Sequence, residues 1–395
     1  MLSVEDALHK ILAETKPTTQ TELIPLISAF QRILSEPQFS QVDVPPADNS
    51  AMDGYAIHTD SLSTQSPLNI SQRIPAGQAP HPLKENTAAR VFTGSEIPVG
   101  ANAVVMQENC EADQKTVFIK HSPSKGDHIR KKGQDISKGS ELFSKGRKLH
   151  APDLGVLASA GIPAVSVFKK LTVGVLTTGD ELIPPGENLL PGQIYNSNHF
   201  TLKGLLESLQ VEMVDLGHIP DSLTATIEAL DKAAKKVDVV LTTGGVSVGE
   251  EDHIKPAIES LGKISMWKLA IKPGKPLAFG HIENTPFFGL PGNPVSALVT
   301  FLIIVRPFLL KAQGLSENSN ETVFLPANFS FSKNTGRQEY LRVRIENSQL
   351  TLFNNQSSGV LSSASWANAL AIVPINTDIN AGDLVETLSF AELGI

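Results

Sequence analysis

The sequence has very little cysteine, with Cys110 as the single example among 395 residues. One cysteine excludes an internal disulfide framework and suits a reducing compartment, so we expect a cytoplasmic protein. The N-terminus, MLSVEDALHKIL, lacks the basic start and the long apolar core that mark a secretory signal peptide. The sequence also contains no repeat and no low-complexity tract. These absences favour an ordinary globular protein.

Positive charge and long apolar runs are scarce as well. The sequence has 33 Lys and Arg against 41 Asp and Glu, a net charge of −8, so we expect no nonspecific attraction to nucleic acid. The longest apolar region, Pro294 to Leu310, is interrupted by Arg306 and Pro307 and is short for a membrane span, so we expect no membrane association. The composition, 41% hydrophobic and 19% charged, is that of a soluble globular protein. A length of 395 residues predicts two to four domains.

The most informative stretch is Asp238 to His253, DVVLTTGGVSVGEEDH. Its apolar start predicts a strand buried on both faces of a parallel sheet, and the helical spacing of Ile254 to Leu261 predicts a helix after it. Gly244 and Gly245 let the backbone turn tightly and come close to a ligand. In an open α/β sheet this loop lies at the edge where ligands bind. Its backbone N–H groups could bind an anion, and its carboxylates could bind a metal ion. The alternative is an ordinary strand-to-helix turn with solvated acids.

A second strand candidate, Thr172 to Thr177, also runs into a polar loop, Thr178-Gly179-Asp180-Glu181. In one parallel sheet both loops open at the same edge, which would bring Glu181 near Asp252. The following segments extend the alternation of strands and helices: a helix capped by Asn198 and running to Leu209, a strand at 211–216 and a helix at 223–235. Asp221 precedes the last helix and could simply be its N-cap.

Two later loops carry groups suited to anions. Met266 to Gly280 places Lys268, Lys272 and Lys275 among prolines, which predicts a rigid phosphate clamp, although solvated surface lysines would look the same. In Phe287 to Val299, Asn293 is a good N-cap and Pro294 a good first helical residue. The start of that helix would offer free N–H groups to an anion.

The remaining chain predicts smaller domains. Helical spacing appears at 4–12, 22–34 and 151–160, while 57–119 reads as short strands and turns. Leu341, Val343 and Ile345 alternate with arginines, the period of a half-buried strand. We therefore divide the chain into a helical linker domain (1–42 plus 136–170), an inserted β domain (43–135), an α/β domain (171–314) and a C-terminal β domain (321–395).

Several stretches together resemble the molybdopterin molybdenumtransferase family, called MoeA in bacteria and the gephyrin E domain in animals. The resemblance rests on DNSAMDGYA, PAGQAP, FTG, VVMQE, TGDEL, GQIYNSN, TTGGVSVGEED, KLAIKPGKP and GLPGNPVSA, in family order from Asp48 to Ala297. It implies a MoCF-type three-layer α/β domain with a mostly parallel sheet, an inserted small β domain, an elongated helical/β N-terminal domain and a C-terminal β-barrel domain. It also implies an elongated homodimer with a composite active site. Further partners would be a molybdopterin adenylyltransferase and molybdoenzyme maturation proteins.

The family's members insert molybdenum from molybdate into adenylylated molybdopterin and release AMP, with magnesium dependence. By similarity, the phosphate end would lie on Gly244, Gly245 and Ser247, and the three lysines would neutralise phosphate or molybdate. The resemblance assigns catalytic roles to Asp53, Asp135, Glu181, Asp221 and Asp252, and Mg²⁺ to Glu181 and Asp252. It assigns substrate binding also to Thr93, Pro291, Pro294, Arg342 and Ser363. Because no cysteine lies near these positions, the dithiolene would supply the sulfur ligands of molybdenum.

Two positions depart from the family pattern. Asn196 stands where an aspartate is common, which puts metal contacts near it in doubt, and His253 stands where an aromatic residue is common. Three alternatives share part of the pattern. A molybdopterin adenylyltransferase would have a similar α/β domain but would lack the N-terminal and C-terminal β domains. A nicotinamide-nucleotide amidase would also have a similar domain but would not explain DNSAMDGYA. A scaffold of the gephyrin type would need a fused partner domain and linker, which we do not expect here.

Overall fold

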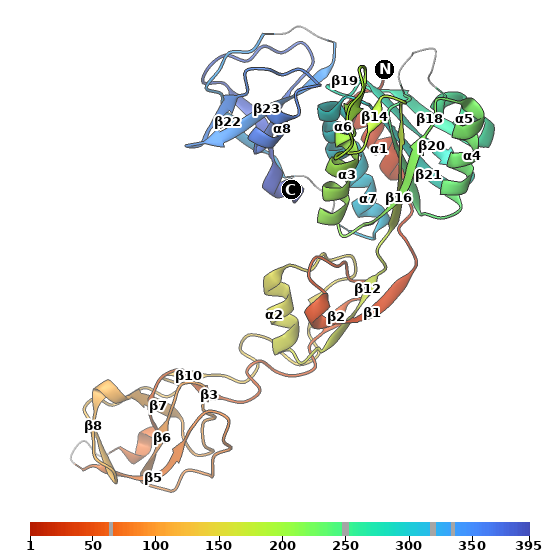
Figure 1. The fold of residues 1–395 in the computed structure, drawn as a ribbon. Coiled ribbons are helices and arrows are strands. Elements are labelled where there is room, and N and C mark those ends of the chain that lie inside the picture. Colours follow the sequence, from red (N-terminus) through yellow and green to blue (C-terminus); the bar gives the residue numbers. More distant parts are fainter. Residues whose placement is uncertain (63–65, 247–252, 317–320, 333–335) are drawn as a thin grey trace.

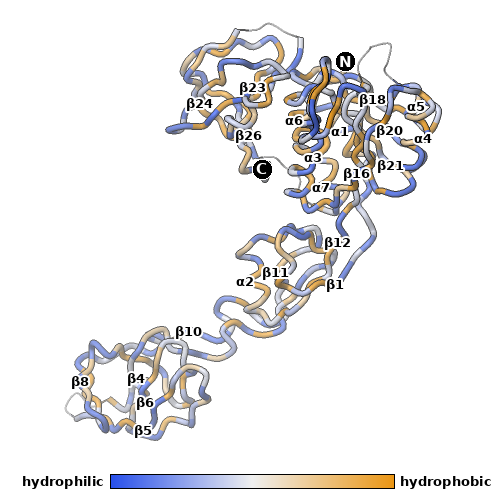
Figure 2. The backbone as a smooth tube through the Cα atoms, viewed as in Figure 1, coloured by the Kyte–Doolittle hydropathy of each residue, from blue (hydrophilic) through white to orange (hydrophobic). Residues whose placement is uncertain are grey.

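The protein is an elongated chain of four domains. This computed structural model describes residues 1–62, 66–246, 253–316, 321–332 and 336–395. The inserted β domain lies at one end, the linker domain in the middle, and the α/β and C-terminal domains side by side at the other end (Figure 1). Each domain has its own hydrophobic cluster, and Figure 2 shows hydrophobic stretches in all four. The fold class predicted from the sequence is confirmed, while the domain boundaries remain a prediction.

A mostly parallel sheet forms the centre of the α/β domain. Its strand order is β16-β13-β17-β21-β20-β18. The first four strands are parallel: β13 (Thr172–Thr178), β16 (Glu212–Ile219), β17 (Val239–Thr243) and β21 (Thr285–Leu290). The last two are antiparallel, β20 (Pro276–Ile282) and β18 (Gly262–Lys268). All five residues of β17 are buried, as expected for a central strand covered on both faces.

Helices cover both faces of this sheet and make three layers. Val239 and Leu241 pack into the cluster under α1 (Val4–Glu14), α3 (Ser197–Ser208), α6 (Pro294–Thr300) and α7 (Arg306–Ala312). Val240, which points to the other face, packs against α4 (Leu223–Ala234) and α5 (Ile254–Leu261). A short ladder of β14 (Leu182–Ile183) and β15 (Ile194–Tyr195) lies outside the sheet. The alternation of side chains along one apolar strand thus fixes both hydrophobic layers.

The most apolar segment of the chain is one long helix. Helices α6 and α7 are joined by a π-helical segment, η4 (Phe301–Val305). The combined helix Pro294–Ala312 is long and apolar enough to cross a membrane, but 89% of its most apolar window is buried inside the protein. This burial marks it as the core helix of the α/β domain. The π segment directly precedes Arg306 and Pro307, where the absent N–H of proline interrupts the regular helical bonding.

The linker domain is built by two separate parts of the chain. Strand β1 (Thr21–Pro25) pairs antiparallel with β12 (Ala164–Phe168), and α2 (Ala151–Ser159) packs against the 3₁₀ turn η1 (Leu26–Ser28). The helix predicted at 22–34 is therefore wrong, because β1 buries alternate residues against β12. Helix α1 packs on α7, and its buried residues belong to the core cluster of the α/β domain. A second small ladder joins β2 (Gln38–Phe39) to β11 (Glu141–Phe143).

The inserted β domain has one mixed sheet, in the order β7-β4-β6-β5-β9-β8. Its strands are β4 (Gly54–Ile57), β5 (Leu68–Ile74), β6 (Thr87–Val91), β7 (Ala103–Met106), β8 (Cys110–Ala112) and β9 (Thr116–Ile119). The short turns η2 (Thr59–Ser61) and η3 (Gln107–Asn109) connect them. A ladder of β3 (Asn49–Ser50) and β10 (Ile129–Arg130) lies where the chain enters and leaves the domain. This domain confirms the predicted insertion of short strands and turns.

The C-terminal domain is a small barrel that shares a strand with the α/β domain. Its strands are β22 (Val323–Pro326), β23 (Gln338–Glu346), β24 (Gln349–Leu352), β25 (Ala369–Val373) and β26 (Leu384–Ser389), with α8 (Ser362–Trp366) and α9 (Phe390–Leu393). A bridge from Ala327 to Leu350 brings the end of β22 back to β24. Strand β19 (Ile271–Lys272), from the loop between β18 and β20, pairs in parallel with β23. The two domains are therefore joined by backbone hydrogen bonding as well as by packing.

Candidate active site

Three glycine-containing loops meet at the carboxyl edge of the sheet. A Cβ built on Gly244 would lie 2.8 Å from Thr178 Oγ1, and one built on Gly292 would lie 3.7 Å from Gly244 Cα. Both Gly244 and Gly245 have positive φ, at +85° and +66°, which favours glycine. The loop after β17 is thus packed against the loops after β13 and β21. The missing Cβ atoms allow this close backbone approach, and ligand binding by the paired glycines stays a prediction.

A side chain of α3 braces this cluster. Asn198 is the second residue of α3, and its side chain donates from Nδ2 to the carbonyl of Gly292, at 2.7 Å. The N-cap of α3 is Asn196, whose side chain accepts from the N–H of His199, so the prediction of Asn198 as the cap is wrong. An asparagine in place of the family's aspartate still serves as a helix cap.

Two of the predicted acids, Glu181 and Asp221, lie on loops at the same edge of the sheet. Glu181 is exposed, and its carboxylate lies over Gly179, where an added Cβ would come 2.7 Å from Oε1. Asp221 is exposed in the loop after β16, and Ser222 takes the N-cap position of α4, so the reading of Asp221 as a cap is excluded. Ser247 and Asp252 fall outside the described residues. The proximity of Glu181 and Asp252 therefore stays a prediction.

The described part of the chain contains no group of three His, Cys, Asp or Glu that could hold a metal ion. Mg²⁺, however, normally takes only one or two carboxylates and completes its shell with water and substrate phosphates. The exposed carboxylate of Glu181, beside the glycine cluster, fits this sparse kind of site. A dedicated all-protein cage is not needed for the predicted metal.

The three predicted lysines differ in their surroundings. Lys268 ends β18 and Lys275 lies in the following loop, and both are exposed. Lys272 lies in β19 and donates from Nζ to both carboxylate oxygens of Glu339, at 2.9 Å each. The Glu339 side chain is only 5% exposed and that of Lys272 is 22% exposed. Lys272 is therefore part of a half-buried ion pair between two domains. Only Lys268 and Lys275 resemble ordinary surface lysines.

A cavity of about 590 Å³ lies between the α/β and C-terminal domains beside this ion pair. The α/β domain contributes Lys272, Lys275 and Ser296, and the C-terminal domain contributes Arg337, Glu339 and the segment Asn355 to Ser358. Three cationic side chains and several hydroxyl groups thus face one space. This donor set suits an oxyanion, because ammonium, guanidinium and hydroxyl groups all donate hydrogen bonds to anionic oxygen.

Arg342 and Ser363, predicted as substrate contacts in the C-terminal domain, lie together in its interior. Arg342 is 1% exposed and donates from Nε to Ser363 Oγ, at 3.1 Å. It also donates to the carbonyls of Tyr340 and Ser357, at 3.4 and 3.2 Å. Burial lowers the pKa of this guanidinium to about 10, against the opposing charge of Glu339. The half-buried strand pattern is therefore wrong at Arg342, because both faces of β23 are covered there.

The start of α6 is less free than the sequence suggested. Asn293 is the N-cap and Pro294 the first helical residue, as predicted. The N–H of Val295, however, donates to the carbonyl of Ser358 in the C-terminal domain, at 3.0 Å. Pro291 is buried and Pro294 half-buried beside this contact. The helix start therefore serves first to hold the two domains together, which corrects the expectation that its N–H groups are all free for an anion.

The predicted residues of the β domain lie far from these loops, at the opposite end of the molecule (Figure 1). Asp53 accepts hydrogen bonds from the N–H and the hydroxyl of Thr93, at 2.8 and 2.9 Å. These bonds lower the pKa of the Asp53 carboxyl and keep it ionised. Asp135 is exposed where the chain returns to the linker domain. Two predicted residues are thus joined in one local site, while the two halves of the predicted active site are separated within a single chain.

The basic segment 128–135 has a structural role in the entry to the β domain. Lys131 pairs with Asp48 at 2.7 Å, and Lys132 with Asp43 at 3.4 Å. Both acids have lowered pKa values in these surroundings. The pairs join the two chain segments that connect the β domain to the linker, so these lysines are weak candidates for a phosphate site.

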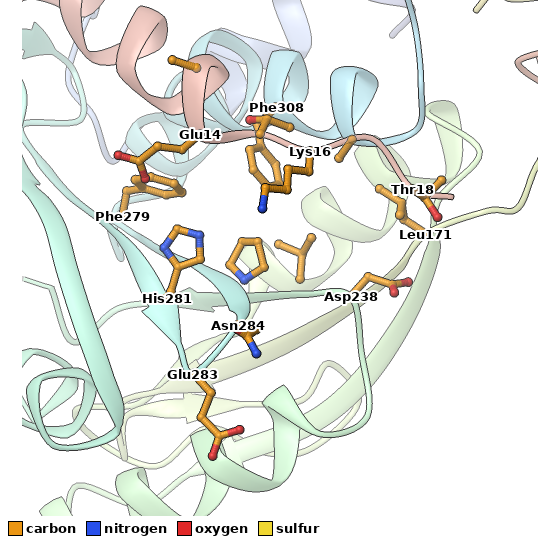
Figure 3. Close-up of a pocket in the computed structure, with 15 residues that line it drawn as sticks. Glu14, Lys16, Thr18, Leu171, Asp238, Phe279, His281, Glu283, Asn284 and Phe308 are labelled. Carbon is orange, nitrogen blue, oxygen red and sulfur yellow. The ribbon is translucent and has the colours of Figure 1, made fainter. Parts of the chain in front are cut away.

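A second cavity, of about 800 Å³, lies at the edge of the sheet opposite to the predicted chemistry. Leu171 and Asp238, which line it, directly precede β13 and β17, so the cavity lies at the amino ends of the parallel strands. Figure 3 shows Lys16 and His281 pointing into the same space from opposite walls, below Phe308. Glu14, Asp238 and Glu283 add negative charge. This acidic surface does not suit an anionic substrate, and none of the predicted site residues lies in it.

Comparison with known proteins gives a consistent family across the whole chain. Residues 2–161 match the MoeA N-terminal region (domain I and II), residues 174–311 a probable molybdopterin binding domain, and residues 325–390 the MoeA C-terminal region (domain IV). A molybdopterin molybdenumtransferase from Haemophilus influenzae is 42% identical over 348 residues, covering 87% of this chain and 85% of that one. The chain belongs to the molybdopterin molybdenumtransferase (MoeA) family. The family predicted from the motifs is thus confirmed.

Further MoeA relatives cover nearly the whole length. A molybdopterin molybdenumtransferase from a Nostoc species is 34% identical over 97% of this chain and 92% of its own. The crystal structure of a molybdopterin biosynthesis MoeA protein from Pyrococcus horikoshii matches 98% of this chain and 100% of that one, with a TM-score of 0.85 and 31% identity. This MoeA chain therefore shares its complete domain order with solved relatives.

In the C-terminal domain the sequence indicated Arg342 and Ser363 as candidate site residues but not the acid that pairs with Lys272. Glu339 was overlooked, although it stands in phase with Leu341 and Val343, where a strand pattern calls for an apolar residue. An acid at such a position signals a buried partner. Ser357 and Ser358 belong to a serine-rich run, and only the fold brings them beside Lys272.

Proposed function

We propose that the chain acts in molybdenum cofactor biosynthesis, taking adenylylated molybdopterin and molybdate, inserting molybdenum into the dithiolene and releasing AMP. The observation that carries this proposal is the cationic, hydroxyl-lined cavity between the α/β and C-terminal domains, whose wall includes Ser296 of α6, the helix that begins two residues after Gly292 of the glycine cluster. Both substrates bear oxyanions, and the curated relatives carry the corresponding transferase name. The single cysteine suits a cytoplasmic location for a thiolate-bearing substrate.

Two neighbouring regions would divide the substrate between them. The backbone of Gly244 and Gly245 can approach a phosphate closely because neither residue has a Cβ. The cavity lined by Lys272, Lys275 and Ser296 can hold a molybdate by charge and hydrogen bonding. The dithiolene sulfurs, rather than protein thiols, would receive the metal, since burial raises the pKa of the Cys110 thiol to about 11 and disfavours the thiolate that binds metals. Orientation of the two anions would then be the main contribution of these residues to catalysis.

Mg²⁺ would be held by Glu181, with Asp252 as its proposed second carboxylate. When bound, the ion would neutralise negative charge on the phosphate that leaves with AMP. Glu181 is supported by its exposed carboxylate beside the glycine cluster. Asp221, on the adjacent loop, would act as a further acid at the same edge.

We further propose a two-fold homodimer in which the β domain of one chain completes the site of the other. The separation of the Asp53–Thr93 pair from the strand edge supports this arrangement (Figure 1). Large apolar side chains are exposed on the linker domain and near the strand edge, including Leu23, Ile27, Leu190 and Phe200, and a second copy would cover such residues. A molybdopterin adenylyltransferase and molybdoenzyme maturation proteins would be transient partners.

The direct test is turnover by the purified full-length protein. It should be mixed with adenylylated molybdopterin and molybdate, with and without Mg²⁺, and AMP measured by chromatography. We expect AMP and molybdenum-loaded cofactor in equal amounts, and little of either without Mg²⁺. Lys275→Met should reduce molybdate-dependent turnover, while Lys263→Met, at the far end of β18, should not. AMP release without molybdenum insertion, or no turnover by a folded dimer, would contradict the proposal.

A further inference from the structure

The ion pair between Lys272 and Glu339 lies in the wall of the proposed oxyanion cavity. The two residues face each other in the parallel pairing of β19 with β23, so the backbone fixes their alignment. Both carboxylate oxygens of Glu339 accept from the Lys272 ammonium at 2.9 Å. The carboxylate is 5% exposed and faces a cavity that Lys275 and Arg337 also line.

Glu339 is the one acid among the described residues that line this cavity. Its negative charge is felt further inside the domain, where it favours the charged form of the buried Arg342 guanidinium. A carboxylate in this position reduces the positive potential that an incoming anion would meet. It also occupies at least two of the three hydrogen-bond donors of Lys272.

We propose that Glu339 is an internal counter-anion of the oxyanion site, and that a bound oxyanion takes over Lys272 from it. The inference rests on the proposed function, in which this cavity holds molybdate. Displacing a bidentate carboxylate is unfavourable for a monovalent anion, which gains little from one lysine. A dianion that also reaches Lys275 and the hydroxyl group of Ser296 gains enough contacts to compete. Glu339 would therefore lower the affinity for all anions and increase discrimination in favour of divalent oxyanions.

Glu339→Gln tests this role because it keeps the shape and removes the charge. Molybdate binding to the full-length protein should be measured by titration calorimetry, with chloride added as a competitor. Removing one negative charge several ångströms from a bound dianion should tighten molybdate binding by about tenfold and make chloride a better competitor. Glu346→Gln is the matched control, since it removes the same charge from the exposed end of β23 and should leave binding within about twofold.

The sign of the effect separates this role from a purely structural one. If Glu339 only positions Lys272, the Gln variant should bind molybdate more weakly, and weaker or unchanged binding would overturn the inference. Should Glu339→Gln not fold, Glu339→Ala tests the same sign. Tighter molybdate binding with unchanged chloride competition would also overturn the role in discrimination. Absence of molybdate binding to both wild type and Glu339→Gln would instead overturn the proposed oxyanion site.

Discussion

The separation of the two halves of the site leads to a sharp prediction about mixed dimers. Asp53 accepts two hydrogen bonds from Thr93 in the β domain, while Glu181 lies at the strand edge at the other end of the chain (Figure 1). Asp53→Asn and Glu181→Gln remove one charge each and keep the shape of the side chain. If both carboxylates are needed in every site, each variant should be inactive as a homodimer. This holds whichever chain provides which residue.

A mixed dimer of the two variants distinguishes the arrangements. With sites built across the two-fold axis, one site combines Asp53 and Glu181 from the two intact halves, and the other combines both substitutions. Purified mixed dimers should therefore recover about half of the wild-type activity, and a randomly mixed population about a quarter.

The assay needs differently tagged chains, denatured and refolded together, with AMP release measured after tandem affinity purification. Mass spectrometry of the intact complex would establish that the dimers are mixed. As a control, dimers in which both tagged chains carry the same substitution should stay inactive after the same refolding. If verified mixed dimers show no recovery, both carboxylates act within one chain or the dimer does not form the site, and the reasoning from the elongated fold is refuted.

Three further predictions concern single residues. Burial raises the pKa of the Cys110 thiol from 9.0 to about 11. At neutral pH the thiol should therefore react with a disulfide reagent about a hundredfold more slowly in the folded than in the unfolded protein, and the rate should increase as the pH approaches 11. Equal rates in the two states would contradict this. Arg342→Met should lower the free energy of unfolding in urea by about 2–4 kcal/mol, because buried acceptors lose their donor, and a loss under about 1 kcal/mol would contradict it. Gly244→Ala should lower the free energy of unfolding by at least about 1 kcal/mol more than Gly77→Ala does. Both glycines have φ near +84°, but only a Cβ at 244 would lie 2.9 Å from the Thr178 carbonyl oxygen. Similar unfolding curves for the two variants would contradict this.

The sequence predicted the α/β domain well because its signals are local and repeated. A buried apolar run such as Val239–Leu241, followed by glycines and then a helical pattern, has few alternative structures. The segment 22–34 was mispredicted because the apolar spacing of a short strand with a following 3₁₀ turn overlaps that of a helix. Only the pairing of β1 with β12, a partner more than a hundred residues away in the sequence, decides between them.

The site itself divides along the same line. The glycines, the lysines, Asp53 and Thr93 could be proposed as site residues because each has a recognisable local pattern or a family motif around it, whereas the hydrogen bonds between Asp53 and Thr93 needed the structure. On β23 the family resemblance indicated only Arg342; Glu339 was not predicted, and alternation along the strand placed Arg342 on a solvent face. That face is instead covered by the α/β domain, as Tyr340 shows by packing in the α/β core.

The orientation of the C-terminal domain is therefore part of the chemistry of the site. Lys272 reaches its place through the pairing of β19 with β23, and the Val295–Ser358 hydrogen bond fixes the same boundary from the start of α6. Because both contacts join the domains at the cavity wall, a rotation of the C-terminal domain would separate Lys272 from Glu339 and move Ser357 and Ser358 away from Lys275. No single segment of the sequence encodes that cavity, since its donors become neighbours only when two independently packed domains share a strand. This explains why motifs could point to the edge of the sheet, whereas the counter-charge beside Lys272 required the folded structure.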